Sequence, residues 1–352
     1  MQNPPPYAEL VCTSNFTFLT GASHPQELVA RAAELGYEAI AITDECSLAG
    51  VVRALEEAQR CAERGQPIRL IPGSSFRLEN GSRLVLLPEN HAGYTEICTL
   101  VTRGRRQAPK GEYALPERSF EHGLAHCIAL WLPVATDETT ESDLLTAHWL
   151  ATYFPERCWL AASLQLGPDD ARRMRRLHNI AHTAGLPLTA CGDVQMHVRS
   201  RRMLHDVLAA IRHGCTVAEL GYRALPCGER HLRPRERLAQ LFPAEWLAAS
   251  IAIAERCRFR LDQLHYRYPR EVVPEGMSAI EHLRELTEAG IRERWGDNWD
   301  NWGQSKNSCE HVSQNHDSGE PSFYSDPNYP DPNYPDPNYP NYRPSVRGCR
   351  LR

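Results

Sequence analysis

Long apolar runs, paired cysteines and lysine are all scarce in this 352-residue chain. It has no run of 18 apolar residues, so the sequence predicts no segment that spans a membrane. Residues 1–6 lack the basic and apolar segments of a secretory signal, and we therefore expect a cytoplasmic protein. The 12 cysteines form no Cys-x-x-Cys pair, so we expect small core residues in a reducing compartment and no disulfide framework.

Lysine accounts for only two of the 39 cationic residues, Lys110 and Lys306, and the others are arginines. Arginine suits bidentate contacts with phosphate, and clusters at 103–106, 172–176 and 199–202 offer such contacts to DNA. Acidic residues nevertheless outnumber basic ones, and the net charge is −5. This balance excludes a strongly basic nucleic-acid-binding chain and favours solvated helix faces for the three clusters.

The composition changes near Gly296. The pentapeptide Asp-Pro-Asn-Tyr-Pro occurs three times in succession over residues 326–340. Two prolines in every five residues exclude a helix and a complete sheet ladder. We therefore predict a disordered low-complexity tail over 296–352. A tyrosine- and proline-rich ligand for a partner protein is the alternative with a function.

Short apolar runs alternate with amphipathic stretches over residues 1–295, with a first strand expected near residues 10–14. The apolar runs predict strands at Ala39–Thr43, Arg69–Leu78, Arg83–Pro88, Cys127–Leu132, Cys158–Leu164 and Pro187–Asp193. The amphipathic stretches predict a helix from an N-cap at Ser23 to a stop at Gly36, and helices over 50–64, 142–153, 169–184 and 199–213. Strand–helix alternation indicates parallel strands in a barrel or a doubly wound sheet. From residue 234 to 295 the pattern becomes mainly helical.

Both architectures place their chemistry at the carboxyl ends of the strands. Asp44 and Glu45 follow one predicted strand, and Asp193 ends another. Carboxylates at such positions suit oxygen-ligated divalent metals or general acid–base chemistry. Carboxylates that merely stabilise helix N-termini are the alternative without a catalytic role.

Other familiar constellations are weak or absent. His178 and His182 share one face of a predicted helix, but the pair lacks the Glu of His-Glu-x-x-His, so solvated histidines are the simpler interpretation. The sequence contains no Gly-x-Ser-x-Gly elbow and no Gly-x₄-Gly-Lys loop. These absences argue against a serine hydrolase of that type and against a P-loop nucleotidase.

Several segments resemble the motifs of the PHP (polymerase and histidinol phosphatase) domain, which opens the bacterial C-family replicative DNA polymerases. They are residues 7–22, 35–52, 71–78 and 191–202. The run from Asp44 to Leu48, together with residues 228–233 and 273–277, is similar to the error-prone branch of that family. The resemblance covers about residues 7–295 in collinear order.

This resemblance implies an α/β fold, a PHP-type distorted (β/α)₇ barrel that is followed by a helical segment and a disordered tail. Its implied domains are a PHP-like domain with C-terminal helices over 5–268 and the start of a connection to a palm domain over 269–295. The third implied region is the low-complexity tail over 296–352.

The metal positions of the PHP motifs are substituted here. Metal-dependent PHP domains open with His-x-His, usually supply a Glu in the third motif and usually end with Asp-x-His. The residues at these positions, in that order, are Val11, Thr13, Ser75, Asp193 and Gln195. Asp44 and Asp193 persist, and Glu45 stands where more active members carry His. Since a metal cluster needs several converging donors, the resemblance implies a relic site at Asp44, Glu45 and Asp193 that binds PHP divalent metals poorly.

The resemblance ends at Trp295, before the palm whose carboxylates hold Mg²⁺ in the family. We therefore expect a non-catalytic PHP portion of an error-prone DNA polymerase, without a cofactor in this chain and without a membrane partner. The family role is DNA-directed DNA synthesis in replication and damage-tolerant repair, with DNA as partner. A free-standing PHP phosphoesterase that uses Asp44, Glu45, Asp193 and a histidine such as His197 is the first alternative. An interaction module that uses the repeat tail is the second.

Overall fold

The computed structural model describes residues 4–134, 139–264 and 272–295 of the chain. The chain divides into two units, residues 1–266 and 267–352. The described part of the second unit contains helix α9 (Ala279–Trp295), whose first turn is capped by the Ser278 hydroxyl and the Glu281 carboxylate. The predicted tail and its repeats lie outside the described residues and remain predictions.

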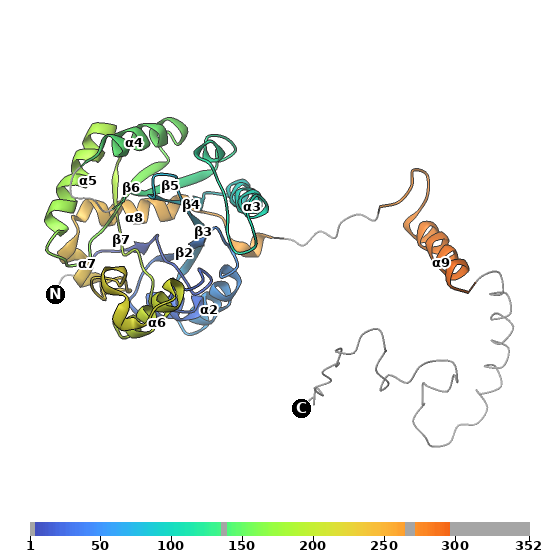
Figure 1. Ribbon diagram of the computed structural model, residues 1–352, viewed down its shortest axis with the longest axis horizontal. Coiled ribbons are helices and arrows are strands. Elements are labelled where there is room, and N and C mark those ends of the chain that lie inside the picture. Colours follow the sequence, from blue (N-terminus) through green and yellow to red (C-terminus); the bar gives the residue numbers. More distant parts are fainter. Residues whose placement is uncertain (1–3, 135–138, 265–271, 296–352) are drawn as a thin grey trace, which may run out of the picture. The chain divides into compact units, whose positions relative to one another are not determined.

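The first unit is a seven-stranded sheet surrounded by helices (Figure 1). The strands are β1 (Ala8–Glu9), β2 (Ala39–Glu45), β3 (Arg69–Arg77), β4 (Arg83–Pro88), β5 (Cys127–Leu132), β6 (Cys158–Ser163) and β7 (Leu188–Cys191). They lie side by side in chain order. The apolar runs therefore predicted six of the strands to within a few residues.

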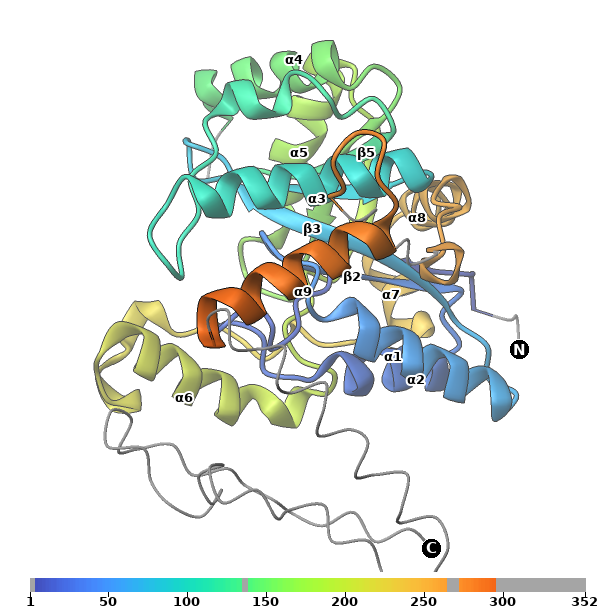
Figure 2. The ribbon, with the colours of Figure 1, turned by 90° about the vertical axis from the view of Figure 1, so that its right-hand side faces the viewer.

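The helices of this unit also follow the amphipathic pattern. They are α1 (Pro25–Glu34), α2 (Val51–Glu63), α3 (His91–Arg106), α4 (Glu141–Tyr153), α5 (Asp170–Ala184), α6 (Arg202–His213), α7 (Arg235–Leu241) and α8 (Ala244–Arg256). Helix α1 packs against α2 and α4 packs against α5, and Figure 2 shows these two pairs on opposite sides of the sheet. Helix α3 was missed by the sequence prediction.

The segments that follow the first and last strands meet and nearly close the sheet into a barrel. Cys12 and Val194 form a parallel bridge. The Val194 amide donates to the Val11 carbonyl at 2.9 Å, and the Thr13 amide donates to the Val194 carbonyl at 2.8 Å. We call this junction, residues 9–13 against 192–194, the seam. The expected seven-stranded α/β barrel is confirmed.

A buried carboxylate also crosses the seam. Glu9 is 1% exposed and accepts hydrogen bonds from the Val11 amide at 3.1 Å and the Gly192 amide at 2.9 Å. The Tyr7 hydroxyl donates to the same carboxylate at 2.9 Å. Glu9 therefore ties β1 to the segment that follows β7.

Strand β4 runs opposite to the parallel direction that the strand–helix alternation predicted. It pairs antiparallel with both β3 and β5, whereas the other neighbouring strands are parallel. The reason is a tight turn that leaves no room for a crossover helix. Gly81 adopts a left-handed φ of 81°, and the Asn80 side chain accepts a hydrogen bond from the Ser82 amide at 3.0 Å.

The predicted start of the first helix is wrong by one residue. The N-cap is His24, whose amide donates to the Glu27 carboxylate at 2.9 Å, and not Ser23. The Ser23 hydroxyl is engaged elsewhere, since it accepts from the His197 amide at 2.9 Å. The predicted stop is confirmed, because Gly36 adopts a left-handed φ of 68°.

Successive residues of a strand belong to two different apolar clusters, because their side chains point to opposite faces of the sheet. Ala39 and Ala41 belong to one cluster, and Ile40 and Ile42 belong to the other. The cluster of Ala39 and Ala41 also contains Ile253 of α8. The ten cysteines in the described part are free, and seven of them are buried, which agrees with the expected role as small core residues. No helix in the described ranges combines the length and apolarity that crossing a membrane requires.

Gly93 in α3 marks a close backbone contact, and Gly93→Ala tests it. A Cβ atom there would lie 2.1 Å from the His126 carbonyl oxygen, which is too close for a non-bonded contact. We expect Gly93→Ala to lower the free energy of unfolding by about 1–3 kcal/mol, although alanine normally favours helices. The measurement is urea denaturation, with Gly167→Ala as control because a Cβ atom at Gly167 meets nothing within 4 Å. Equal stability of the two variants would contradict this contact.

Candidate functional site

A polar pocket lies where the parallel strands reach their carboxyl ends. Thr13 follows β1, Ser163 ends β6 and Asp193 follows β7, and all three line the pocket. Arg83 reaches the same edge from the first position of β4, because that strand is reversed. We call this cavity the arginine-lined pocket. The arginines that line it are Arg77, Arg83, Arg173, Arg176, Arg212, Arg223 and Arg230.

Asp193 is bound by guanidinium groups. It is buried, sits in left-handed backbone with φ 47° and forms ion pairs with Arg83 and, at 3.1 Å, with Arg230. Burial alone would raise its pKa, but Arg230, Arg83 and Arg173 together hold the pKa at about 2. Asp193 is therefore a carboxylate whose charge the chain itself neutralises.

Asp44 is enclosed by a different set of donors. Its carboxylate accepts hydrogen bonds from the Ser14 amide at 2.8 Å, the Ser14 hydroxyl at 2.7 Å and the Thr17 hydroxyl at 2.8 Å. Asp44 is 1% exposed, and this burial raises its pKa. Asp44 is not among the residues that line the pocket. It holds the loop after β1 in place.

Glu45 is the third residue of the predicted acidic site and lines the pocket. Its carboxylate accepts a hydrogen bond from the Tyr113 hydroxyl at 2.8 Å and lies 3.4 Å from Nε of Arg77. The structure thus brings Glu45 and Asp193 to one cavity, each with an arginine partner. Asp44 lies on the same strand but has separate partners.

The four substituted positions carry no charge. The Val11 side chain is buried in the apolar cluster of Ala39 and Ala41 and has no donor atom. Thr13, Ser75 and Gln195 line the pocket with neutral polar groups. The Gln195 side-chain oxygen lies 3.0 Å from Nε2 of His205. Burial lowers the pKa of His205 to about 4, and the neighbouring Arg230 contributes in the same direction.

These residues do not fit the divalent metal cluster that PHP domains imply. Such a cluster needs several deprotonated oxygen or nitrogen ligands that converge on each ion. Within the described ranges, no group of three or more His, Cys, Asp or Glu side chains is placed to hold a metal ion. The carboxylates of Asp44, Glu45 and Asp193 are instead engaged by protein donors.

The candidate histidines lie away from this pocket. His197 contacts the Ser23 hydroxyl at 2.8 Å, beside the start of α1. His178 and His182 are exposed on α5, and the ring of His178 packs 5.1 Å from the ring of Trp246. None of these three residues lines the arginine-lined pocket.

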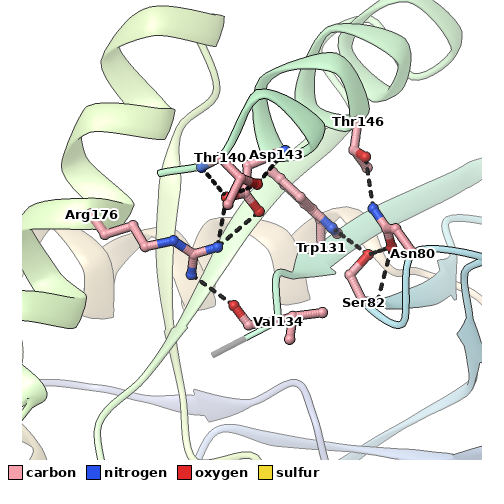
Figure 3. Close-up of polar contacts among 8 residues, drawn as sticks. All are labelled: Asn80, Ser82, Trp131, Val134, Thr140, Asp143, Thr146 and Arg176. Carbon is pink, nitrogen blue, oxygen red and sulfur yellow. Dashed lines mark hydrogen bonds and ion pairs between the residues drawn. The ribbon is translucent and has the colours of Figure 1, made fainter. Parts of the chain in front are cut away.

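An ion pair between Arg176, which lines the pocket, and Asp143 joins α5 to α4, as Figure 3 shows. Arg176 of α5 donates to both carboxylate oxygens of Asp143 at 2.8 Å and to the Val134 carbonyl at 2.8 Å. The Thr140 amide and hydroxyl also donate to Asp143, each at 2.8 Å, and so cap α4. The expectation that residues 172–176 form a solvated helix face is wrong for Arg176, which is 4% exposed.

A second part of the same network fixes the β3–β4 turn. The Asn80 amide donates to the Thr146 hydroxyl of α4 at 2.8 Å (Figure 3). The indole of Trp131, which is fully buried on β5, donates to the Ser82 hydroxyl at 3.0 Å. The turn that carries β4 to the pocket edge is therefore held by α4 and β5.

Sequence reasoning missed the cationic partners of the acidic site. Arg83 and Arg230 are distant from Asp193 in sequence, and only the folded barrel brings them to it. One signal was present: a carboxylate predicted inside a barrel needs a cationic partner, and nearly all cations of this chain are arginines.

Comparisons with known proteins find a matching domain family and similar polymerases. The PHP domain family matches residues 9–158. The error-prone DNA polymerase of Methylococcus capsulatus is 53% identical over 82% of this chain, and that of Pseudomonas aeruginosa strain PAO1 is 51% identical over 82%. The chain spans 27% of the length of each polymerase.

Among solved structures, an amidohydrolase from Chromobacterium violaceum aligns with a TM-score of 0.41 and 15% identity. That alignment covers 54% of this chain and 88% of the amidohydrolase. The seven-stranded barrel, the PHP match and the identity of about half to these polymerases lead to one conclusion. The chain is similar to the PHP-domain region of error-prone DNA polymerases.

Proposed function

We propose that this chain serves as the PHP region of an error-prone DNA polymerase in the cytoplasm and has no phosphoester-hydrolysing metal centre of its own. DNA synthesis then belongs to the complete polymerase, with Mg²⁺ held by a palm domain outside the resemblance described above. The observation that carries the proposal is Asp193, whose two oxygens are engaged by Arg83 and Arg230. A divalent cation would have to displace both guanidinium groups.

The exposed face of α6 supports a role as a docking module. Met203, Val207 and Ile211 follow one another at a spacing of four residues, so they share one face of the helix. Their exposed fractions are 80%, 44% and 60%. Since the curated relatives are several times longer than this chain, we assign the remainder of the polymerase chain as the occupant of this face.

A free-standing phosphoesterase has less support. It would need a metal-bound hydroxide at the barrel edge, and therefore ligands that are not already neutralised. Val11 supplies no donor, and Asp44 is enclosed by Ser14 and Thr17. The phosphoesterase would require the contacts of Asp44 with Ser14 and Thr17 to rearrange.

The first experiment measures metal content and activity of the full chain. We expect purified protein to hold far less than one Zn, Mn or Fe per chain, and to show no primer extension with Mg²⁺ or Mn²⁺. Stoichiometric metal that is lost in Asp193→Ala would instead support the phosphoesterase. Template-dependent extension that a substitution within residues 1–295 abolishes would contradict the absence of a polymerase site.

A chimera tests whether this chain can act as the PHP region of an active polymerase. Replacing the matching region of the Methylococcus capsulatus polymerase with residues 1–295 is expected to preserve primer extension. Ile211→Asp in that chimera should reduce its yield or its activity, because a charge would enter the proposed docking face. Phe18→Asp is the control, since Phe18 is 83% exposed and lies outside α6. An inactive chimera with a folded PHP region would contradict the assignment.

A further inference from the structure

The arginine-lined pocket has an excess of positive charge that its own carboxylates do not balance. Seven arginines and two carboxylates, Glu45 and Asp193, line it. Arg176 has its own partner in Asp143 outside the lining. Three guanidinium groups, those of Arg83, Arg173 and Arg230, stabilise the single carboxylate of Asp193.

Arg173 and Arg212 of the lining also donate to neutral oxygens. Arg173 lies 3.5 Å from the Ser163 carbonyl, and Arg212 donates to the Thr20 hydroxyl at 2.9 Å. The other polar side chains of the lining include Thr13, Ser75 and Gln195, which are neutral. The cavity therefore combines fixed cations, hydroxyl groups and amide groups at the carboxyl ends of the strands.

We propose that the arginine-lined pocket binds a phosphate group without any metal, with Arg173, Arg212 and Arg230 as donors. The planar fork of a guanidinium group matches two oxygens of a phosphate, and a phosphate dianion offsets part of the uncompensated positive charge. Field lines from several cations converge in a cleft with protein walls, which raises the local concentration of anions. Arginine side chains thus supply the positive charge that metal ions supply in metal-dependent PHP domains.

Asp193 has an unusual part in this proposal. It is an internal anion that pairs with Arg83 and Arg230, so it competes with an incoming phosphate for Arg230. Removing its charge is therefore expected to strengthen binding. A metal-dependent site predicts the opposite, because there Asp193 would be a ligand.

The probes are inorganic phosphate and dAMP, titrated calorimetrically into the full chain at pH 7 in the presence of EDTA. Deoxyadenosine, which lacks the phosphate, is the negative ligand. We expect both phosphates to bind in EDTA and deoxyadenosine not to bind. If dAMP binds more tightly than inorganic phosphate, the site is assigned to the terminal phosphate of a nucleotide. If inorganic phosphate binds and dAMP does not, the site is assigned to the free anion.

Variants then separate the site from general surface charge. Arg212→Met is expected to weaken phosphate binding about tenfold, whereas Asp193→Asn should tighten it several-fold. Asparagine suits the left-handed backbone at position 193, and Arg212 is exposed, so both variants are expected to fold. Arg175→Met, an exposed arginine on α5 outside the pocket, is the matched control. Thermal unfolding of each variant checks its folding.

Three results would overturn the proposal: no phosphate binding by wild type and Asp193→Asn, binding that EDTA abolishes, or equal loss in Arg175→Met and Arg212→Met. The proposal is independent of the polymerase assignment. The chimera tests that assignment through primer extension, and it can succeed or fail whether or not the pocket binds phosphate.

Discussion

Arg176→Met is expected to lower the free energy of unfolding by about 3–5 kcal/mol, because it leaves a buried carboxylate without its cation. The side chains of Arg176 and Asp143 are 3% and 9% exposed, so water cannot replace the lost partner. The same substitution removes the hydrogen bond to the Val134 carbonyl. Urea denaturation at pH 7 measures the effect.

Two comparisons make that experiment specific. Arg175→Met, on the same helix but exposed, should change the stability by no more than about 0.5 kcal/mol. Adding Asp143→Leu to Arg176→Met should recover part of the loss, since the unpaired carboxylate is then gone. A loss below about 1 kcal/mol for Arg176→Met would show that the pair contributes little to the joint between α4 and α5.

Raising the pH from 5 to 8 is expected to destabilise the wild type by about 3 kcal/mol more than Glu9→Gln. Burial raises the pKa of Glu9 from 4.5 to about 7, even though the amides of Val11 and Gly192 stabilise its charge. Between these two values the unfolded chain loses this proton while the folded chain keeps it. Stability therefore falls as the pH rises through this window, and Glu9→Gln removes that contribution.

His205 contributes with the opposite sign. Its pKa is lowered to about 4 in the folded protein against 6.5 in the unfolded chain, so its contribution to stability is lost as the pH falls from about 6.5 to 4. Because both proteins contain His205, their difference reports Glu9 alone. Urea denaturation at four pH values between 5 and 8 provides the curves, with exposed Glu63→Gln as control. Parallel curves for wild type and Glu9→Gln would contradict a raised pKa at Glu9.

The pattern of apolar residues predicted most of this barrel, because strand and helix periods are local properties. Asp44, Glu45 and Asp193 were placed at the strand ends for the same reason. The direction of β4 was predicted wrongly, since Asn80 and Gly81 fix a turn that the general alternation rule overlooks. Careful attention to that pair would have indicated the hairpin.

The pairing of Asp193 with Arg83 and Arg230 lies beyond what a local pattern can show. Arg83 is 110 residues from Asp193 in sequence, and no spacing rule links them. The same holds for Arg176, whose burial depends on the packing of α5 against α4. Charged residues on a helix look alike in sequence whether their partner is water or a carboxylate.

The seam determines the order in which the barrel can be completed. Neighbouring strands such as β3 and β4 pair across a short turn, whereas Glu9 and Gly192 are 183 residues apart. Bringing such distant residues together costs loop-closure entropy that near neighbours avoid, so local pairs form first. On the ribosome, β1 emerges before the other strands of the sheet, and the seam can form only after residues 192–194 have been synthesised. Throughout that interval the edge of β1 has β2 alone as its partner strand, and the growing chain carries an open sheet.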